Sequence, residues 1–467
     1  MTPVARFMIS AAHKSSGKTV VSSGLAAALA ARGHDVAAFK KGPDYIDPMW
    51  LRLASGHPAY NLDFNTMDTA EIRSLFAEKS AGHSVSLIEA NKGLFDGVAA
   101  DGSDSNAALA RLLATPVILV VDTSGMTRGI APLLQGYLGF DPAVEIAGVI
   151  LNKTAGARHE SKLRQAVETY TGLRVLGAVA ASPDMDISER HLGLTTPAET
   201  KGPGDFLDHA AVRIEQSVDV DAVLEISQNA GAFPLTPARP AATRGPHLRI
   251  GIARDAAFGF YYADDLEAFE AQGGELVPVD MLNDPVLPQI DGLFIGGGFP
   301  ETQMDALADN ATMRDSVRTA LENGLPAYAE CGGLMYLCRS LTWQGKTRPM
   351  AGFFDADTLV HDRPQGRGYV RFSPGPDALW PGGEKTMHAH EFHYASLEKV
   401  SNAAFARRVR RGHGIDGLND ALVKNNTTAG FIHLRHTAAT PWVSDFLHFV
   451  AQCRATKNPA QIARGSA

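Results

Sequence analysis

The stretch AHKSSGKT, residues 12–19, has the residue types and spacing of a phosphate-binding loop. It follows a short apolar segment and continues into a segment rich in Ala and Leu, so a strand, a loop and a helix are predicted in the order that such a loop requires. Backbone N–H groups at the helix N-terminus would bind phosphate, and the lysine would reach the outer phosphate oxygens. A helix cap with an incidental lysine is the alternative, which the order of the elements disfavours. We therefore predict that the phosphates of a nucleotide bind at Ser15, Ser16, Gly17, Lys18 and Thr19.

Carboxylates follow two other predicted strands. Glu89 ends an apolar segment, Asp96 follows it in a glycine-rich turn, and KKGPDYIDP supplies Asp44 and Asp47 after another apolar segment. Any one of these acids fits ordinary turn chemistry. Strands that share a sheet edge with the phosphate loop would bring all of them to it. We predict a phosphoryl-transfer site in which Thr19, Asp47 and Glu89 ligate Mg²⁺.

Asn152 and Lys153 follow a further predicted strand. This position would place them beside the nucleotide, where they could contact a purine ring. The dipeptide alone is weak evidence, so its assignment to the nucleotide site depends on the phosphate loop.

A second reactive position is Cys331, in the stretch LPAYAECGGLMYL. It stands directly after a predicted strand and before a Gly-Gly start of a helix, which is the pattern of a nucleophile elbow. In such an elbow the side chain is exposed, and the helix N-terminus favours the thiolate. The alternative is a buried cysteine that only fills space, because cysteine is among the most buried residue types.

A nucleophilic thiol needs an oxyanion site and a base. The stretch LFIGGGFPE is another strand that runs into glycines, so the backbone amides of Gly297 and Gly298, with that of Gly332, are predicted to form the oxyanion site. His433, at the end of a predicted strand, is the predicted base, although a histidine there is often only a satisfied polar residue.

The histidine-rich stretch HAHEFH raises the possibility of a zinc site. Strand alternation places His388 and His390 on one face and His393 on the other, which is unfavourable for three ligands to one ion. Without a CxxC pair or an acid at ligand spacing, zinc is not favoured.

The elements that must position these residues alternate between short apolar segments and amphipathic ones, which predicts parallel sheets with crossover helices. In the first half, strands are predicted at residues 5–10, 35–39, 85–89, 116–121, 146–151 and 174–178. After a Pro- and Ala-rich stretch, strands are predicted at residues 248–253, 275–279, 292–296, 325–329 and 428–433. We therefore predict two α/β domains, at residues 1–230 and 247–467, joined by a linker at 231–246.

Length and composition agree with two packed domains. The chain has 467 residues, of which 45% are hydrophobic and 20% charged, and its net charge is −8. That composition excludes a largely disordered chain, and the lack of a basic block argues against nucleic acid or an anionic membrane as partner. Three cysteines allow at most one disulfide, and no apolar segment is long enough to span a bilayer or resemble a secretion signal. We expect the cytoplasm as compartment.

Taken together, these motifs resemble the glutamine-dependent cobyrinic acid/hydrogenobyrinic acid a,c-diamide synthases of corrin biosynthesis. The resemblance covers nearly the whole chain, and PDYIDP with ARDAAFGFYY is far more specific than a phosphate loop alone. The matching stretches, in family order, are SSGKT, KKGPDYIDPMW, EANKGLFDG, GVILNKTAGARHESKLRQAVE, ERHLGL, ARDAAFGFYY, GGGFPE, AECGGLMYL, HEFHYAS and FIHLRH.

The resemblance implies a dethiobiotin synthetase-like P-loop domain followed by a class I-like glutaminase domain. Cys331 would be the glutaminase nucleophile and His433 its activating base. In the other domain, ATP and Mg²⁺ would be bound by Lys18, Thr19 and Glu89. Near the carboxylates of the corrinoid substrate would lie Asp44, Tyr45, Ile46, Asp47 and Asp96.

The resemblance also implies the reaction, which belongs to cobalamin biosynthesis. L-Glutamine would give ammonia, ATP would activate the a and c acetate carboxylates as acyl phosphates, and ammonia would convert them to amides. A homodimer is allowed. Ordinary class I glutaminases carry a glutamate two residues after the histidine, whereas Arg435 stands there, so the group that orients His433 is not identified.

Other functions stay open at this point. Cobyric acid synthase and nickel-sirohydrochlorin a,c-diamide synthase share the layout; PDYIDP favours the a,c-diamide group without separating its members, and no residue reports on cobalt. A partition-type ATPase switch is an alternative of a different class. His13 at the position of the signature lysine of those switches, and the whole second domain, argue against it.

Overall fold

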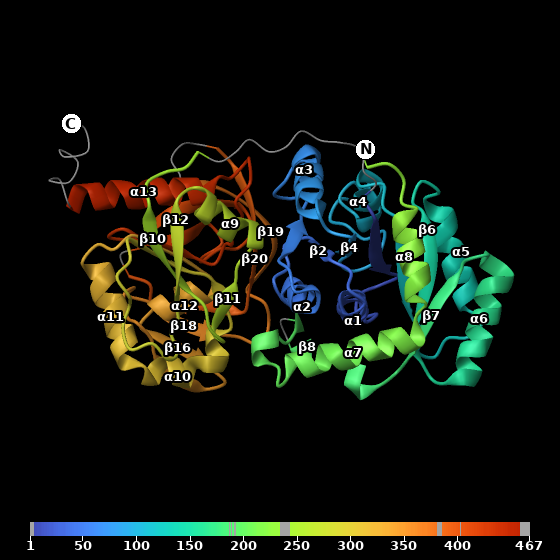
Figure 1. The fold of residues 1–467 in the computed structure, drawn as a ribbon. Helices are drawn as coiled ribbons and strands as arrows, with labels where there is room; N and C mark the ends of the chain where they lie inside the picture. The colour runs from blue at the N-terminus through green and yellow to red at the C-terminus, as the bar shows by residue number, and fades with distance from the viewer. Residues whose placement is uncertain are drawn as a thin grey trace. The chain divides into compact units, whose positions relative to one another are not determined.

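The computed structural model of the chain describes residues 4–185, 187, 189, 190, 193–233, 243–380, 385–401 and 403–457. Contacts within the chain divide it into two compact units, Met1–Arg239 and Pro240–Ala467 (Figure 1). Most of the predicted linker, at 234–242, lies outside the described residues, as do residues 191 and 192 of ERHLGL.

The first unit is built on one sheet of seven parallel strands in the order β3-β2-β4-β1-β5-β6-β7. The strands are β1 (Arg6–Ala11), β2 (Val36–Lys41), β3 (Ala59–Leu62), β4 (Val85–Glu89), β5 (Val117–Asp122), β6 (Ile146–Thr154) and β7 (Val175–Ala180). All six predicted strands are present within a few residues of their expected ends. β3 was not predicted, because its four residues, AYNL, do not form an apolar run that sequence patterns can separate from a loop.

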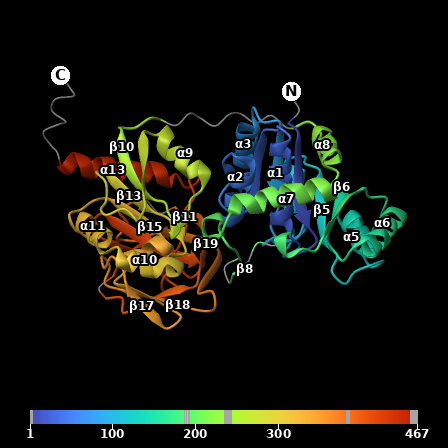
Figure 2. The same ribbon diagram turned by 60° about the horizontal axis from the view of Figure 1, so that its bottom comes forward.

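Helices follow most strands of this sheet, as parallel pairing requires. They are α1 (Lys18–Ala31), α2 (Ile46–Ser55), α3 (Thr69–Ser80), α4 (Asn106–Leu112), α5 (Ile130–Phe140), α6 (Ala157–Thr171), α7 (Pro203–Ser217) and α8 (Val220–Gln228). α7 lies across α1 (Figure 2). A Cβ on Gly24 of α1 would be 2.8 Å from Cγ1 of Ile214, so this close crossing explains the small residues of α1. The two-residue strands β8 (Glu189–Arg190) and β9 (Gly193–Leu194) form a separate hairpin.

The second unit is built on a nine-stranded mixed sheet in the order β12-β10-β13-β15-β24-β23-β22-β19-β20. Its parallel part consists of β10 (Leu248–Ala253), β12 (Gly274–Val279), β13 (Gly292–Ile295), β15 (Ala327–Glu330) and β24 (Thr427–Gly430). Its antiparallel part consists of β19 (Gly366–Pro374), β20 (Met387–His393), β22 (Ala404–Arg411) and β23 (Asn419–Lys424). The parallel strands were predicted, whereas the antiparallel extension was not.

The predicted strand at 428–433 was too long at its carboxyl end. β24 ends at Gly430, because the N–H groups of Phe431 and Ile432 donate to the Asp420 carboxylate at 2.9 and 3.3 Å instead of to a neighbouring strand. His433 lies beyond the strand and pairs with His390 in an isolated bridge.

Smaller elements complete the second unit. A four-stranded sheet contains β16 (Ser340–Trp343), β17 (Lys346–Pro349), β18 (Asp357–Val360) and β21 (Ala395–Glu398), and β11 (Phe258–Phe260) pairs with β14 (Gly297–Gly298). The helices are α9 (Ala263–Ala271), α10 (Met304–Asp309), α11 (Ala311–Glu322), α12 (Gly332–Leu337) and α13 (Trp442–Lys457). No helix among the described residues has both the length and the apolar character needed to cross a bilayer.

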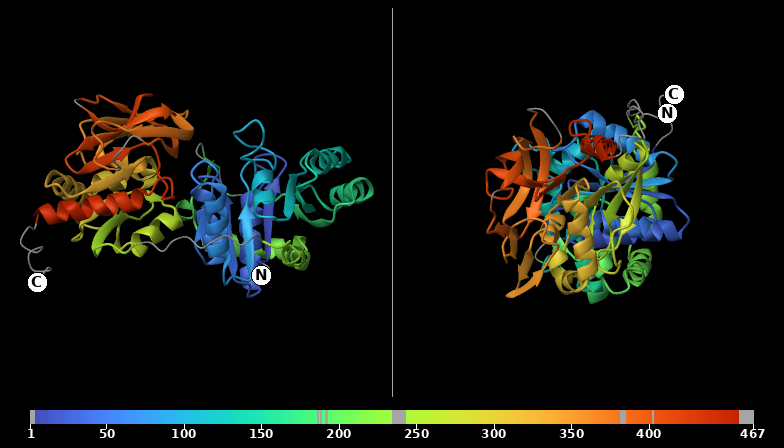
Figure 3. Two further views of the ribbon diagram at one scale, coloured as in Figure 1. Left: turned by 90° about the horizontal axis from the view of Figure 1, so that it is seen from above. Right: turned by 90° about the vertical axis from the view of Figure 1, so that its left-hand side faces the viewer.

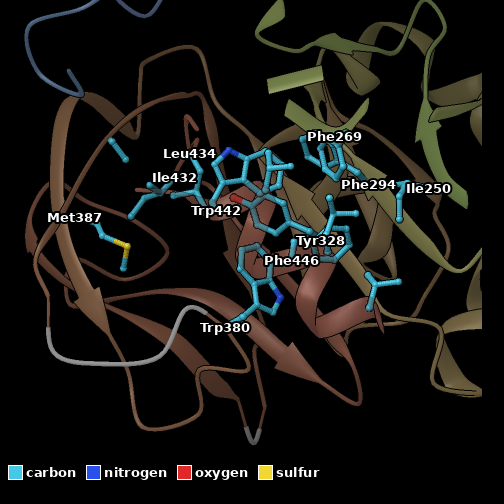
Figure 4. Packing of buried hydrophobic residues seen from close by; sticks show 14 of the residues in the cluster. Ile250, Phe269, Phe294, Tyr328, Trp380, Met387, Ile432, Leu434, Trp442 and Phe446 are labelled. Atoms are coloured by element: carbon cyan, nitrogen blue, oxygen red, sulfur yellow. The ribbon is translucent and has the colours of Figure 1, made fainter. Parts of the chain in front are cut away.

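An aromatic core joins α13 to the sheet of the second unit. α13, the red helix of Figure 3, lies along the yellow-green parallel strands. Trp442 and Phe446 of α13 meet Tyr328 of β15 and Trp380 in a buried cluster (Figure 4). Ile432 joins the same cluster, so the chain on one side of His433 is anchored in the core.

Phe446→Ala tests how much this aromatic core contributes to the free energy of unfolding. The side chain is fully buried, so its removal leaves a cavity, and we expect unfolding of the second unit to become easier by about 3–5 kcal/mol. Leu418→Ala is the matched control, because Leu418 is 67% exposed and its loss should change the free energy by less than about 0.5 kcal/mol. Urea unfolding measures both, and equal effects would contradict this account of the core.

Candidate active sites

The phosphate loop connects β1 to α1 with a left-handed glycine at its end. Gly17 has φ +82°, and a Cβ there would be 2.3 Å from Nδ2 of Asn152. That amide donates a hydrogen bond to the carbonyl of Ser16 at 2.9 Å, and Nζ of Lys153 donates to the carbonyl of Ser15 at 3.1 Å. The structure therefore brings Asn152 and Lys153 to the predicted loop, where both hold its backbone.

Beside the loop, three predicted metal ligands meet a lysine that was not predicted. Thr19 Oγ1 donates to Glu89 Oε1 at 2.8 Å. Lys40 Nζ lies 3.0 Å from the same Glu89 oxygen and 2.5 Å from Oδ2 of Asp47. Lys40 and Glu89 are partners across β2 and β4, and Glu89 is also the partner of Ile9 on β1. The strand order β2-β4-β1 thus brings these groups to one edge of the sheet.

Burial and charge set the protonation of this cluster. Burial raises the pKa of Glu89 to about 7, and attraction to Lys40 offsets part of this effect. Burial alone would raise the pKa of Asp47, but the Lys40 charge and hydrogen bond lower it. The pKa of Lys40 is raised, because attraction to Asp47 and Glu89 outweighs the cost of burying its charge. Burial, together with the Lys40 charge, lowers the pKa of Lys18 to about 8.

The donor set fits Mg²⁺. Thr19, Asp47 and Glu89 offer only oxygen atoms, which this ion prefers. Oε2 of Glu89 is buried and accepts no hydrogen bond from the part of the chain that the structure describes. A buried carboxylate oxygen without a donor is costly, and a cation would satisfy it.

The predicted substrate residues lie next to this cluster. Asp44 accepts hydrogen bonds from the N–H groups of Ile46 and Asp47 at 2.9 and 3.1 Å, which starts α2 with Tyr45 as its N-cap residue. Burial and the Asp47 charge raise the pKa of Asp44 to about 6. Asp96 is exposed and accepts from the N–H of Gly93 at 3.0 Å, and its charge acts on Lys18.

In the second unit, Cys331 has the strained backbone of a nucleophile elbow. It lies between β15 and α12 with φ 49° and ψ −102°. A Cβ on Gly333 would be 2.3 Å from the carbonyl oxygen of Ile295, so only glycine lets α12 begin so close to β13. The turn that joins strand to helix was predicted correctly.

The environment of the thiol differs from the prediction. We expected an exposed side chain whose thiolate is favoured, but Cys331 is 7% exposed. Burial raises its pKa, and the negative charges of Glu301 and Glu330 add to the rise, although a hydrogen bond from Gly332 acts in the opposite direction. The thiol is therefore protonated at neutral pH, and proton removal has to accompany its reaction.

The predicted glycines and the predicted base lie together. A Cβ on Gly297 would be 2.7 Å from Cε1 of His433, and a Cβ on Gly332 would be 3.2 Å from the amide nitrogen of Gly298. Gly332 directly follows Cys331. Gly297 is therefore close to the imidazole, and Gly298 is close to the residue that follows the thiol, so the three glycines could form an oxyanion site there.

Glu330 is a residue of this site that the sequence analysis did not assign. Its Oε2 lies 3.3 Å from Nδ1 of His433. Arg435, which stands where ordinary glutaminases have glutamate, instead pairs with Asp264 at 2.9 Å. An acid immediately before the nucleophile was the signal in the sequence, but its contact with a histidine a hundred residues later depends on the fold.

The histidines of HAHEFH do not gather around one point. The His390 ring stacks on His433 with centroids 4.9 Å apart, and the His393 ring stacks on Phe431 at 4.0 Å. Among the described residues, the one group with metal-ligand spacing is Asp35, His57 and His83, at the opposite end of the strands from the phosphate loop. His390 and His393 therefore pack against different aromatic rings.

Comparisons with known proteins match both units. Residues 7–194 match the family described as the CobQ/CobB/MinD/ParA nucleotide binding domain, and residues 249–440 match the CobB/CobQ-like glutamine amidotransferase domain. The chain is 42% identical over 454 residues to the cobyrinate a,c-diamide synthase of Magnetococcus marinus, covering 96% of this chain and 97% of that protein. It is 37% identical over 484 residues to the enzyme of the same name from Methanosarcina acetivorans, with 98% and 97% covered.

Gly17→Ala tests the geometry of the phosphate loop. The new Cβ would displace Asn152, so we expect nucleotide affinity to fall at least about tenfold, or 1.4 kcal/mol. Gly33→Ala is the matched control, because Gly33 has a similar φ of +84° with nothing within 4 Å of a Cβ. It should lose stability through backbone strain but keep its nucleotide affinity. Calorimetric titration with an ATP analogue measures both, and equal losses of affinity would contradict the assigned geometry.

Proposed function

The chain belongs to the cobyrinate a,c-diamide synthase family, and we propose that it converts the a and c acetate carboxylates of a corrinoid to amides with ATP and glutamine. It is a glutamine-dependent amidating ligase, with a nucleotide-binding domain followed by a glutamine amidotransferase domain. This membership argues against the partition-type switch. The observation that carries the proposal is the identity of 42% over nearly the full length of a cobyrinate a,c-diamide synthase, together with two separate candidate sites of the matching chemistry. The reaction would belong to cobalamin biosynthesis, with cobyrinic or hydrogenobyrinic acid as substrate.

The second unit would make ammonia. The Cys331 Sγ–H bond breaks, its proton passes to His433, and the sulfur electron pair forms a bond to the carboxamide carbon of glutamine. The amide oxygen, which becomes negatively charged, would be bound by the N–H groups of Gly297, Gly298 and Gly332. The C–N bond then breaks and ammonia leaves with the proton from His433. Water hydrolyses the thioester and restores the thiol.

The first unit would activate the carboxylate. An oxygen of the substrate carboxylate attacks the γ-phosphorus of ATP, and ADP leaves. Ammonia attacks the carbonyl carbon of the resulting acyl phosphate, and inorganic phosphate leaves as the amide forms. A free carboxylate is a poor acyl donor because oxide is a poor leaving group, and phosphate removes that obstacle. Each amide therefore requires one ATP and one glutamine.

The contacts of the first unit support specific roles. The loop residues Ser15, Ser16 and Gly17 would bind phosphates through their N–H groups, and Lys18 would neutralise the outer phosphate oxygens. Mg²⁺ would be held by Thr19, Asp47 and Glu89, and would supply positive charge to the phosphates. Asn152 and Lys153, which hold the loop, would complete the ATP site. Substrate binding would fall to Asp44, Tyr45, Ile46 and Asp96.

Cys331→Ala tests the division of labour between the two units. We expect glutamine-dependent amidation to fall more than about 1000-fold, because the nucleophile is gone. Amidation with ammonium salts should stay close to the wild-type rate, because the first unit is untouched. Cys338→Ala is the control, since Cys338 is also a buried thiol of this unit. Loss of the ammonia-dependent reaction in Cys331→Ala would contradict the proposal.

The substrate is tested by mass spectrometry after incubation with ATP, Mg²⁺ and glutamine. Hydrogenobyrinic acid and cobyrinic acid are offered separately, and we expect two successive mass decreases, each equal to the exchange of a hydroxyl for an amino group. The faster conversion identifies the preferred macrocycle. At ATP concentrations below saturation, the Gly17→Ala variant should form product more slowly than the wild type with either nitrogen donor. Amidation of neither macrocycle by the wild-type protein would overturn the assignment.

A further inference from the structure

We infer that Glu330 positions the imidazole of His433 and stabilises the positive charge that the ring acquires during the reaction. It would do so in place of the glutamate that follows the histidine in ordinary class I glutaminases. This inference rests on the proposed function, because it takes Cys331 and His433 to act on glutamine. It adds a positioning residue from the last position of β15, directly before the nucleophile.

Both oxygens of the Glu330 carboxylate face the segment that carries the histidine. Oε2 lies 3.3 Å from Nδ1 of His433, and Oε1 accepts a hydrogen bond from the N–H of Leu434 at 2.7 Å. Glu330 is 2% exposed and His433 3%, so water competes little for this contact. A carboxylate at Nδ1 keeps the proton of the neutral ring on Nδ1, so the lone pair of the ring that can take up a proton is the one on Nε2.

The carboxylate is itself held in place. The hydroxyl of Tyr328 donates to Oε1 of Glu330 at 2.5 Å, and Arg407 donates to the same hydroxyl at 2.9 Å. Arg407 also lies 3.3 Å from the Asp420 carboxylate. The ring of Tyr328 is fixed among Trp442, Trp380 and Phe446 in the aromatic core (Figure 4). These contacts therefore hold the Glu330 carboxylate in a fixed orientation.

The backbone on both sides of His433 is fixed in the same way. Asp420 accepts from the N–H groups of Phe431 and Ile432, and the side chains of Ile432 and Leu434 belong to the core (Figure 4). Successive side chains of an extended segment point to opposite sides. His433 therefore faces away from the core, toward Gly297 and Glu330.

The other charged and titratable groups around the imidazole have different partners or no charge. Arg435 pairs with Asp264 and lies 4.9 Å above the Tyr262 ring. His390 stacks on His433, and burial together with the nearby His433 and Arg435 lowers its pKa well below the usual value, so it is neutral. Glu301, like Glu330, acts on the Cys331 thiol through its charge.

The chemistry requires such an acid. Burial and the nearby carboxylates raise the pKa of Cys331, so its thiol keeps its proton until the attack begins. When the Sγ–H bond breaks and Nε2 of His433 takes the proton, the imidazole becomes positively charged in a buried site. Glu330 then forms an ion pair with it, which lowers the free energy of this state. No proton has to reach Glu330.

Glu330→Gln tests the inference, because it keeps the size and the hydrogen-bond capacity of the side chain but removes its charge. We expect kcat for glutamine hydrolysis to fall about 100- to 10,000-fold with KM changed less than about threefold. Glu330→Asp, which keeps the charge, should retain more activity than Glu330→Gln.

Ammonia-dependent amidation and the thermal unfolding temperature are measured on the same proteins, so that a folding defect is recognised. If Glu330→Gln does not fold, Tyr328→Phe replaces it, because the loss of the hydroxyl frees Glu330 without removing a buried charge. We expect it to reduce kcat about threefold to tenfold, as the loss of one hydrogen bond allows. Wild-type kcat and KM for glutamine hydrolysis, in whichever of these two variants folds, would overturn the role of Glu330. Glutaminase activity in Cys331→Ala would instead overturn the proposed function.

Discussion

The ammonium group of Lys40 lies buried between Glu89 and Asp47, and the phosphate site of the first unit depends on this ion cluster. Two carboxylates this close in a buried site would otherwise repel each other and take up protons. With Lys40 between them, Asp47 stays ionised and Glu89 contacts Thr19, the first hydroxyl after the lysine of the phosphate loop. One Glu89 oxygen is still left without a donor among the described residues, which gives a metal ion a place beside the lysine.

The parallel pairing of strands places the site residues in both units. In the first, the groups that meet at the phosphate loop follow β2, β4 and β1, which are neighbours in the sheet. In the second, Gly297, Cys331 and His433 follow β13, β15 and β24, which are also neighbours. Carboxyl ends of adjacent parallel strands meet at one edge of a sheet, so residues far apart in the sequence converge there. Each site also contains a backbone that only a special turn allows, at Gly17 and at Cys331.

Sequence reasoning found the groups whose signal is local. The phosphate loop, the glycines around the thiol and the elbow at Cys331 were predicted because each motif lies within about ten residues, the range over which strand and turn patterns are readable. Lys40 was missed because its role comes from pairing with Glu89 across two strands. Glu330 was missed because its partner His433 is remote in the sequence and because Arg435 occupies the usual position of the acid.

Two predictions from the sequence that the structure contradicts failed for similar reasons. The antiparallel strands β19, β20, β22 and β23 carry many charged or polar residues, as in AFARRVRR, so their apolar pattern is weak. The thiol of Cys331 was expected to be exposed and ionised, but burial depends on what packs over the elbow, and burial decides its pKa. In both cases the missing information is tertiary packing.

The most direct test of the account is to follow oxygen from substrate to phosphate. The corrinoid is prepared with ¹⁸O in its acetate carboxylates, and the phosphate released during amidation is examined by ³¹P NMR. If the first unit activates the carboxylate as an acyl phosphate, each amide formed transfers one ¹⁸O atom to inorganic phosphate, and ADP is the nucleotide product. Inorganic phosphate without ¹⁸O, or label found in AMP, would contradict the account.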